Sequence, residues 1–565
     1  MSFKELNLNK QDILYLTLLL IIGCLITINM INFNQKIGIY CADVIVYYFN
    51  SLNFAGMNPQ NLLGNSNMFL SPFLCFLTSL LVRVGVRSEL SILITTGILA
   101  IIGNIGLYIL LKNKFSSLLS FTGAVFYSSL SIMLIWWSNG TFDIPTVSIS
   151  IWVIIFTIIA IDKNPKYYIL ALPLFVLALF SRYTAGFMLP LMLLYFFQKH
   201  DFFKNLDNLI SDRKKFKNDF SNFFKSDEFK YIAVGIVISV ILSIIIIEAI
   251  LLSGSPLTFI TQTKDSVTGF QDHVNDHGYN TNILFYLENF LNFQFSNKII
   301  FDELNPSYTT PSPIAYIISL IVIFGLIIKV SSLKVIKSDF KTENYEKILK
   351  LIMIILIVAA IIGVKISFLV SDIAILVIAL IVSTLTEKYA SKLSILMISW
   401  FLIYFIFFSI NSIKLDRYMI TLMPAIAYLF IYCLNEILNR FDKIRMIKLI
   451  PVILVLIFIV SAVNFTENFE NPQTLANIND TYDFLVEYDS DLLTKDIISQ
   501  SYRYGALYLH KNMTPVKSEY MKHLDSNNYT YLILNNKNTA KYNDELNKNF
   551  ENIYHNKDYN IFKRK

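Results

Sequence analysis

The sequence predicts a mainly α-helical, polytopic membrane protein of about 13 transmembrane helices, with interfacial helices in the first outer loop and a small C-terminal α/β domain outside the membrane. Composition indicates the class, because 55% of the 565 residues are hydrophobic and only 16% are charged. The architecture follows from repeated apolar runs close to the roughly 20 residues that cross a bilayer as a helix. The net charge of +6 and the 4 cysteines, which lack metal or disulfide spacing, point to neither nucleic acid nor a disulfide scaffold.

Thirteen segments have the length and composition of membrane spans. They cover residues 12–33, 89–111, 115–137, 144–161, 166–181, 183–198, 231–252, 312–330, 351–370, 372–386, 393–410, 418–434 and 449–463. The first segment lacks the small-residue cleavage site of a signal peptide, so it is predicted to remain as a span. A further apolar stretch, 67–84, carries Pro72 and Arg83 and is predicted to lie in the interface.

Lysine and arginine separate the two sides of the membrane. With the N-terminus inside, the inside segments hold 25 Lys and Arg in 92 residues, whereas the outside segments before residue 464 hold 8 in 129. Cytoplasmic loops retain positive charge. We therefore expect a multi-pass protein of the cell membrane, with a cytoplasmic N-terminus and an extracytoplasmic C-terminal domain.

The chain is predicted to divide into a membrane module, 1–463, and a C-terminal α/β domain, 464–565. In that domain TLANINDTYDFLVEY and SYRYGALYLH have helical patterns, and DIISQS, YTYLILNN and YNIFKRK have strand patterns. Two more segments face outward, the first outer loop at 34–88 and a large outer loop at 253–311. The catalytic or binding surface is expected among these outer pieces.

Asp43 stands at the start of ADVIVYYFNSLNF, whose apolar and aromatic spacing predicts an amphipathic helix in the membrane interface. Two interpretations of Asp43 stay open. It either caps that helix or has a functional role at the membrane surface.

Ionisable residues also gather at the predicted outer ends of the spans. They are Asp143, Arg182, Glu248, Lys365, Asp372 and Arg417. Charges within a bilayer are costly and usually mark a site, although each of these side chains alone is also explained by snorkelling or a local ion pair. Six charges of both signs at one face favour a polar chamber that opens outward.

The order of these features resembles the GT-C superfamily of polyprenyl-phosphate-sugar glycosyltransferases, especially the protein O-mannosyltransferases and the aminoarabinose transferases of lipid A. The resemblance rests on CADVIVYYFNSLNFAG, FLSPFLCFLTSLLVRVG, SNGTFDIP, SRYTAGFMLPL and RYMITLMPAIA, taken in that order. It covers residues 35–200 in detail and 412–428 as a second anchor, with layout alone in between.

The resemblance implies an integral membrane glycosyltransferase that uses a polyprenyl-phosphate sugar donor, with a protein, lipid or glycan as acceptor. Asp43 would act as the base or organiser, and Asp143 would assist. Arg182 and Arg417 would hold the donor phosphate. Lys365 is added from its predicted depth in the membrane.

The residue types suit this chemistry. The phosphate is itself the leaving group, so a Gly-rich nucleotide loop is not expected, and the sequence contains none. Cations at the membrane surface stabilise the departing phosphate, and a carboxylate accepts the acceptor's proton. Many family members carry paired acids at the first site, whereas Ala42 and Val44 flank Asp43 here, so the sequence requires no cofactor.

One motif in the large outer loop keeps a divalent metal under consideration. In DHVNDHGY the residues Asp272, His273, Asp276 and His277 include two histidines four apart, a spacing used for metals on a helix. The neighbouring Gly278 and polar residues favour a loop instead, either solvated or used as an acceptor gate.

Two other functions compete with glycosyl transfer. A transporter or lipid-linked sugar flippase is expected to show internal repeats and midplane binding residues, and the sequence shows no convincing repeat. A scaffold that only displays the C-terminal domain leaves the charges at the span ends unexplained.

Overall fold

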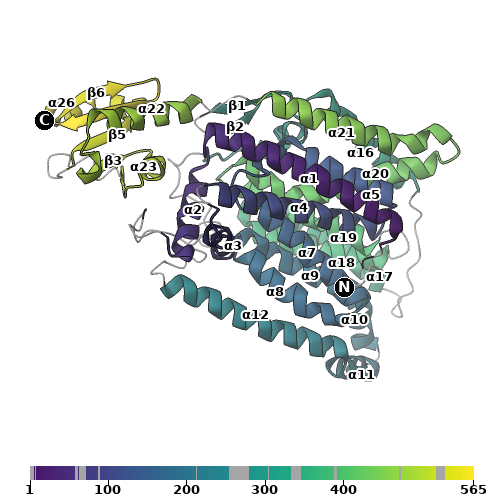
Figure 1. The fold of residues 1–565 in the computed structure, drawn as a ribbon. Helices are drawn as coiled ribbons and strands as arrows, with labels where there is room; N and C mark the ends of the chain where they lie inside the picture. Colours follow the sequence, from purple (N-terminus) through teal and green to yellow (C-terminus); the bar gives the residue numbers. More distant parts are fainter. Residues whose placement is uncertain are drawn as a thin grey trace.

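The structure is a computed structural model that describes residues 6, 8–57, 62, 71–86, 89–211, 213–252, 279–302, 305–332, 345–386, 391–469, 473–516 and 529–565. It is a bundle of long helices with a small α/β domain at one end (Figure 1). The mainly helical membrane fold predicted from the sequence is confirmed.

Ten helical segments among the described residues are long and apolar enough to cross a membrane. They are α1 (Lys10–Ile37), α4 (Leu90–Lys112), α7 (Asp143–Asp162), α12 (Asp227–Leu252), α16 (Pro313–Ser332), α17 (Tyr345–Ile366), α18 (Phe368–Leu385), α19 (Lys392–Ile410), η5 (Asp416–Leu422) continued by α20 (Met423–Arg440), and η6 (Arg445–Leu449) continued by α21 (Ile450–Glu467).

The other three predicted spans coincide with shorter or broken helices. Residues 115–137 form α5 (Ser117–Ser129) and α6 (Ser131–Trp136), which meet at the extended residue Leu130. The next two contain η2 (Pro165–Tyr167) with α8 (Tyr168–Leu179), and η3 (Tyr183–Phe187) with α9 (Met188–Lys199). The count of thirteen therefore stays a prediction.

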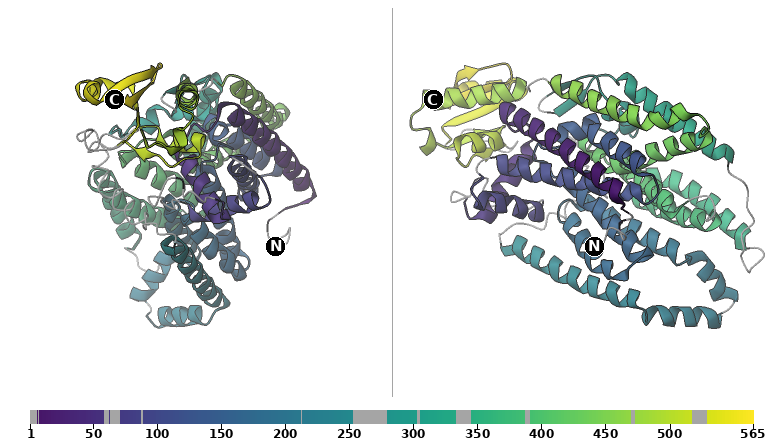
Figure 2. Two further views of the ribbon diagram at one scale, coloured as in Figure 1. Left: turned by 60° about the vertical axis from the view of Figure 1, so that its left-hand side comes forward. Right: turned by 45° about the vertical axis from the view of Figure 1, so that its right-hand side comes forward.

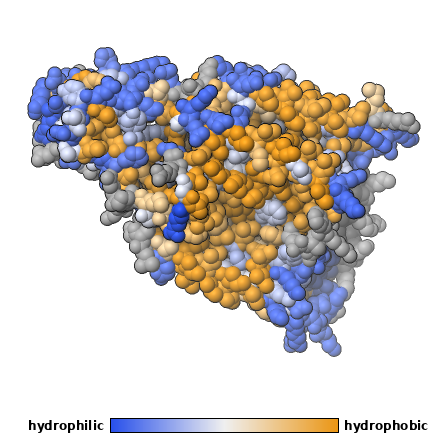
Figure 3. Space-filling model, in the orientation of Figure 1, coloured by the Kyte–Doolittle hydropathy of each residue, from blue (hydrophilic) through white to orange (hydrophobic). Residues whose placement is uncertain are grey.

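Burial separates the centre of the bundle from its rim. Helix α7 is the most enclosed span, because 89% of the residues in its apolar stretch are buried. In α12 and in α17 only 11% of the corresponding residues are buried. Hydrophobic side chains cover the middle of the face in Figure 3, and hydrophilic ones gather at the C-terminal domain and at the opposite end. This pattern fits an apolar belt in contact with lipid.

The two ends of the bundle carry different pieces. Helices α10 (Phe202–Ser211) and α11 (Arg213–Phe224), from the predicted inside segment richest in lysine and arginine, lie at the end away from the C-terminal domain (Figure 1). Helix α2 (Ala42–Ala55) packs on α3 (Pro72–Arg83) at the other end. At 12 residues α3 is too short to cross a bilayer.

The predicted helix after residue 41 forms, but it is more enclosed than an amphipathic surface helix. Residues 44–51 of α2 are all buried. Nor does Asp43 cap the helix, because the N-cap residue is Cys41 and it makes no side-chain capping bond.

Between α12 and α16 the described residues form α14 (Phe285–Glu288), α15 (Phe290–Gln294) and a hairpin of β1 (Ile299–Asp302) and β2 (Asn305–Tyr308). The hairpin reaches the C-terminal side of the bundle, where Ile299 bridges Phe469. Asp272, His273, Asp276 and His277 lie outside the described residues.

The C-terminal domain is an α/β unit beyond the membrane module (Figure 2). Its sheet has the order β4-β3-β5-β7-β6, with β3 parallel to β4 and β5 and the other pairs antiparallel. The strands are β3 (Ile497–Ser499), β4 (Thr514–Pro515), β5 (Tyr531–Asn535), β6 (Phe550–His555) and β7 (Tyr559–Arg564), and the helices are α22 (Gln473–Tyr488), η7 (Leu492–Thr494), α23 (Tyr502–Leu509), α25 (Asn536–Lys541) and α26 (Asn543–Asn549).

All five C-terminal segments predicted from the sequence have the expected secondary structure. They are the amphipathic helices α22 and α23 and the apolar strands β3, β5 and β7. Helix α23 packs against α2 of the membrane module, and this contact brings the C-terminal domain to the site described next.

Candidate active site

Four of the predicted charges form one cluster at the end of the bundle that carries the C-terminal domain. Arg417 Nη2 lies 2.6 Å from Asp43 Oδ2, and Arg417 Nη1 lies 3.8 Å from Asp143 Oδ2. Arg182 Nη1 donates to the same Asp143 oxygen at 3.1 Å. The pairs run as a chain, Asp43–Arg417–Asp143–Arg182, in which two carboxylates and two guanidinium groups balance each other.

Local backbone geometry brings Asp43 into the cluster. Helix α1 ends at Gly38, whose φ of +84° turns the chain toward α2. Tyr40 then donates its hydroxyl to the Ile135 carbonyl at 2.8 Å, which fastens this connection to α6. Asp43 therefore stands in the first turn of α2, where the helix dipole favours a negative charge.

Asp143 likewise lies in the first turn of a helix, as the first residue of α7, and only 2% of it is exposed. The loop before it turns at Gly140, with φ +92°, and a Cβ there would overlap the Val44 side chain. Tyr47 and Phe142 stack across the same contact, with ring centroids 4.3 Å apart. Because this loop packs directly on α2, Asp143 comes close to Asp43.

Both arginines occupy irregular turns that lead into spans. Arg182 is the extended residue before η3, and Arg417 lies within η5, before α20. The Arg417 guanidinium faces the Trp136 ring at 5.9 Å, and that of Arg182 faces the Tyr418 ring at 6.0 Å. Only 9% of the Arg417 side chain is exposed, so its position is set by protein contacts on all sides.

A third guanidinium reaches the cluster from the C-terminal domain. Arg503 Nη1, on α23, lies 3.5 Å from Asp43 Oδ1. Burial raises the pKa of the Asp43 carboxyl, but Arg417 and then Arg503 outweigh that effect and hold the pKa below its ordinary value of 3.8. Asp43 is therefore ionised at neutral pH.

Sequence reasoning missed Arg503. It is one of two arginines after residue 463 and follows a tyrosine in a correctly predicted helix, but nothing in the sequence shows that this helix packs on α2. It also missed Asp416, whose Oδ2 accepts hydrogen bonds from Trp136 Nε1 at 2.7 Å and from the Tyr308 hydroxyl at 2.8 Å. Through Tyr308 the β1–β2 hairpin reaches the residue next to Arg417.

Three predicted charges lie apart from the cluster. Lys365 is exposed in the last turn of α17, and Glu248 is exposed on α12. Asp372 is buried in α18, and its carboxylate oxygens find no hydrogen-bond partner among the described residues. The assignment of Lys365 to the donor phosphate thus has no geometric support, because helix depth alone does not determine which neighbour a side chain faces.

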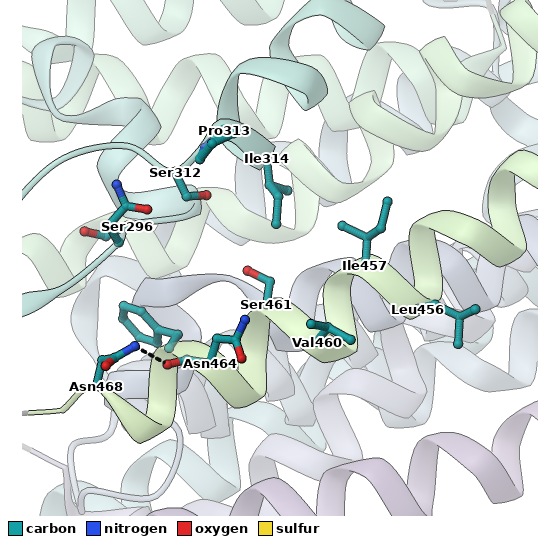
Figure 4. Close-up of a pocket in the computed structure, with 12 residues that line it drawn as sticks. Ser296, Ser312, Pro313, Ile314, Leu456, Ile457, Val460, Ser461, Asn464 and Asn468 are labelled. Atoms are coloured by element: carbon teal, nitrogen blue, oxygen red, sulfur yellow. Dashed lines mark hydrogen bonds between the residues drawn. The ribbon is translucent and has the colours of Figure 1, made fainter.

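Two cavities among the described residues are not lined by the residues of the cluster. The larger, about 540 Å³, opens between the start of α16 and the C-terminal half of α21 (Figure 4). There Ser461, Asn464 and Asn468 form a polar end, and the apolar Ile457 and Leu456 lie farther along the same helix. The smaller, about 330 Å³, separates the ends of α1 and α4 from α22 and α23, and Tyr504 lines it. We take the charge cluster as the candidate site, since it holds the ionisable groups that group transfer needs.

Comparison with solved structures shows a shared fold. The crystal structure of ArnT from Cupriavidus metallidurans bound to undecaprenyl phosphate shares the fold, with a TM-score of 0.50, 10% identity and coverage of 97% of both chains. The oligosaccharyltransferase AglB from Archaeoglobus fulgidus, in complex with an inhibitory peptide and a dolichol-phosphate, aligns with a TM-score of 0.49 and 12% identity over 94% of this chain and 70% of that one. The chain therefore shares the fold of ArnT.

A sequence match agrees with the fold. Residues 70–208, about a quarter of the chain, match the family described as dolichyl-phosphate-mannose-protein mannosyltransferase. No curated protein matches the chain in sequence. The resemblance to GT-C glycosyltransferases predicted from the sequence is confirmed, and the findings support this class over a transporter.

Proposed function

We propose that the protein transfers a sugar from a polyprenyl-phosphate-linked donor to an acceptor on the extracytoplasmic side, with inversion at the anomeric carbon. The observation that carries the proposal is the chain of ion pairs Asp43–Arg417–Asp143–Arg182 at one end of a GT-C fold. A related fold in ArnT binds undecaprenyl phosphate, a lipid whose charge such a cluster suits.

Asp43 has the chemistry of the base. The acceptor hydroxyl oxygen attacks the anomeric carbon, its proton passes to the Asp43 carboxylate, and the carbon–oxygen bond to phosphate breaks with its electron pair left on the phosphate. Asp43 is ionised and 30% of its side chain is exposed, so it has the charge state that a base requires and is not sealed in the core. A positioned general base contributes about 10²- to 10⁴-fold.

Arg182 and Arg417 serve the leaving phosphate. Negative charge grows on that phosphate during transfer, and fixed guanidinium donors stabilise it. The arginine guanidinium has five N–H donors, and among the described residues that of Arg182 donates only from Nη1, to Asp143. Asp143 then has an electrostatic role, since it holds the two arginines close together.

This chemistry requires no cofactor. The Asp43 and Asp143 carboxylates already pair with guanidinium groups, so these arginines supply the positive charge that a divalent ion supplies elsewhere. Within the described residues no three His, Cys, Asp or Glu side chains come together as metal ligands. The histidines at 273 and 277 remain the alternative source of a metal site.

The sidedness belongs to the same proposal. The basic helix α11 lies away from the C-terminal domain (Figure 1), and cytoplasmic segments retain such charge. The N-terminus is then cytoplasmic and the active site extracytoplasmic. The donor carries a hexosyl or pentosyl group, and the acceptor is a protein, lipid or glycan.

A transfer assay tests the proposal. Purified protein in sealed vesicles receives a radiolabelled polyprenyl-phosphate sugar and a membrane extract as acceptor, and we expect covalent label in the acceptor. Asp43→Asn should reduce turnover by about 10²- to 10⁴-fold, whereas Asp442→Asn, at an exposed acid of the opposite end, should not. Label that crosses the membrane without covalent transfer would favour the transporter instead.

A further inference from the structure

The three arginines around Asp43 and Asp143 outnumber the carboxylates. Arg182 and Arg417 balance the two acids, so Arg503 is the additional positive charge. A polyprenyl phosphate that carries a sugar is a phosphodiester with one negative charge. One unmatched guanidinium therefore fits the charge of one bound donor.

Arg503 is also the least constrained of these arginines. Its distance to Asp43 Oδ1 is 3.5 Å, against 2.6 Å for Arg417 to Oδ2, and 27% of its side chain is exposed, against 9% for Arg417. Arg417 is held by Asp43, Asp143 and the Trp136 ring. Arg503 instead takes its support from its own domain, where Nε donates to the neighbouring Tyr502 hydroxyl at 3.1 Å.

The present arrangement opposes base catalysis at Asp43. Each carboxylate oxygen faces a guanidinium group, which lowers the basicity of the carboxylate and occupies the oxygen that an acceptor hydroxyl needs. One arginine has to withdraw before the hydroxyl can reach Asp43. The weaker contact and greater exposure make Arg503 the one that withdraws.

We propose that Arg503, supplied by the C-terminal domain, binds the phosphate of the lipid-linked donor and in doing so exposes Asp43 Oδ1 to the acceptor hydroxyl. This inference rests on the proposed glycosyl transfer and adds a phosphate-binding residue to it. The same guanidinium then faces the second negative charge that appears on the phosphate when the glycosidic bond breaks. Donor binding and activation of the base are thereby linked through one side chain.

The space around α23 allows such a movement. Tyr504, the next residue, lines the 330 Å³ cavity between the C-terminal domain and the ends of α1 and α4. The face of α23 that carries Tyr504, Leu507 and Tyr508 therefore borders a hollow instead of a filled core. A shift of the Arg503 side chain requires no repacking of the sheet, since α23 lies at the membrane side of the domain.

The test compares Arg503→Ala and Arg503→Lys with the wild type and with Lys557→Ala, a control at an exposed lysine of the same domain. Two quantities are measured: binding of a polyprenyl monophosphate without sugar, with inorganic phosphate as competitor, and KM and kcat with the sugar-bearing lipid. A charge-assisted hydrogen bond to phosphate predicts binding about 10- to 100-fold weaker in Arg503→Ala. Arg503→Lys should recover part of this, because lysine keeps the charge but not the fork.

A further measurement distinguishes direct contact of Arg503 with the phosphate from a purely structural role of this residue. Added guanidinium ion should restore part of the activity of Arg503→Ala and none of that of Asp43→Asn. Unchanged lipid binding and KM in Arg503→Ala would overturn the inference, as would a fall in kcat alone that guanidinium does not restore. Absence of transfer by the wild type would instead refute the proposed function itself, and Arg503→Lys provides the comparison if the alanine variant fails to fold.

Discussion

Replacing Asp143 by asparagine tests whether the ion pairs hold the site together. Asp143 is the shared partner of Arg182 at 3.1 Å and Arg417 at 3.8 Å. At an effective dielectric constant of about 20, each attraction has a gross value of about 4–5 kcal/mol. Desolvation of the ions offsets most of this, and loss of one partner from a buried pair typically costs about 3–5 kcal/mol.

We therefore expect Asp143→Asn to lower the free energy of unfolding by about 3–5 kcal/mol, because two guanidinium groups then share one site without their common acid. The measurement is denaturant unfolding in detergent micelles. Glu346→Gln is the matched control, since it removes an exposed i,i+4 pair with Lys350 that contributes only about 0.3–0.5 kcal/mol.

The double variant Asp143→Asn/Arg182→Gln separates stability from function. It removes one charge of each sign, so the net charge of the cluster is unchanged and most of the lost stability should return, while transfer activity should not. Wild-type stability in Asp143→Asn would refute the reasoning that these pairs are buried and strong. Full activity in the stable double variant would refute the role of both residues in transfer.

Three further outcomes follow from the site. Arg417 and Arg503 hold the pKa of Asp43 below 3.8. The stability from these ion pairs is therefore fully present above about pH 4 and is lost at more acidic pH, as the carboxyl protonates. A loss of stability near pH 6 that is assigned to Asp43 would contradict this. Chelation with EDTA should leave transfer unchanged, and loss of activity that returns with a divalent ion would direct attention to His273 and His277. Lys365→Ala should keep activity within about twofold because Lys365 is exposed outside the cluster, where substitutions have small effects; a large rise in the donor KM would restore its predicted role.

The polar cluster was partly visible in the sequence. Asp43, Asp143, Arg182 and Arg417 stand out because charges are scarce near apolar spans. Lys365 is also a charge near the end of an apolar span, yet it lies outside the cluster. Position along a helix does not determine the direction in which a side chain points. A search for charges near membrane spans does not find Arg503, because this residue belongs to the C-terminal domain.

The sequence by itself determined the class of the protein, its apolar helices and the elements of the C-terminal domain. These depend on hydropathy and on local periodicity, which adjacent residues specify. Only the tertiary structure decided which charges meet: Asp43 and Arg417 are 374 residues apart and Asp43 and Arg503 are 460 apart, yet each pair is in contact. Such contacts arise where α2 meets Arg417 of η5, the loop before α7 and helix α23, and no local pattern encodes them.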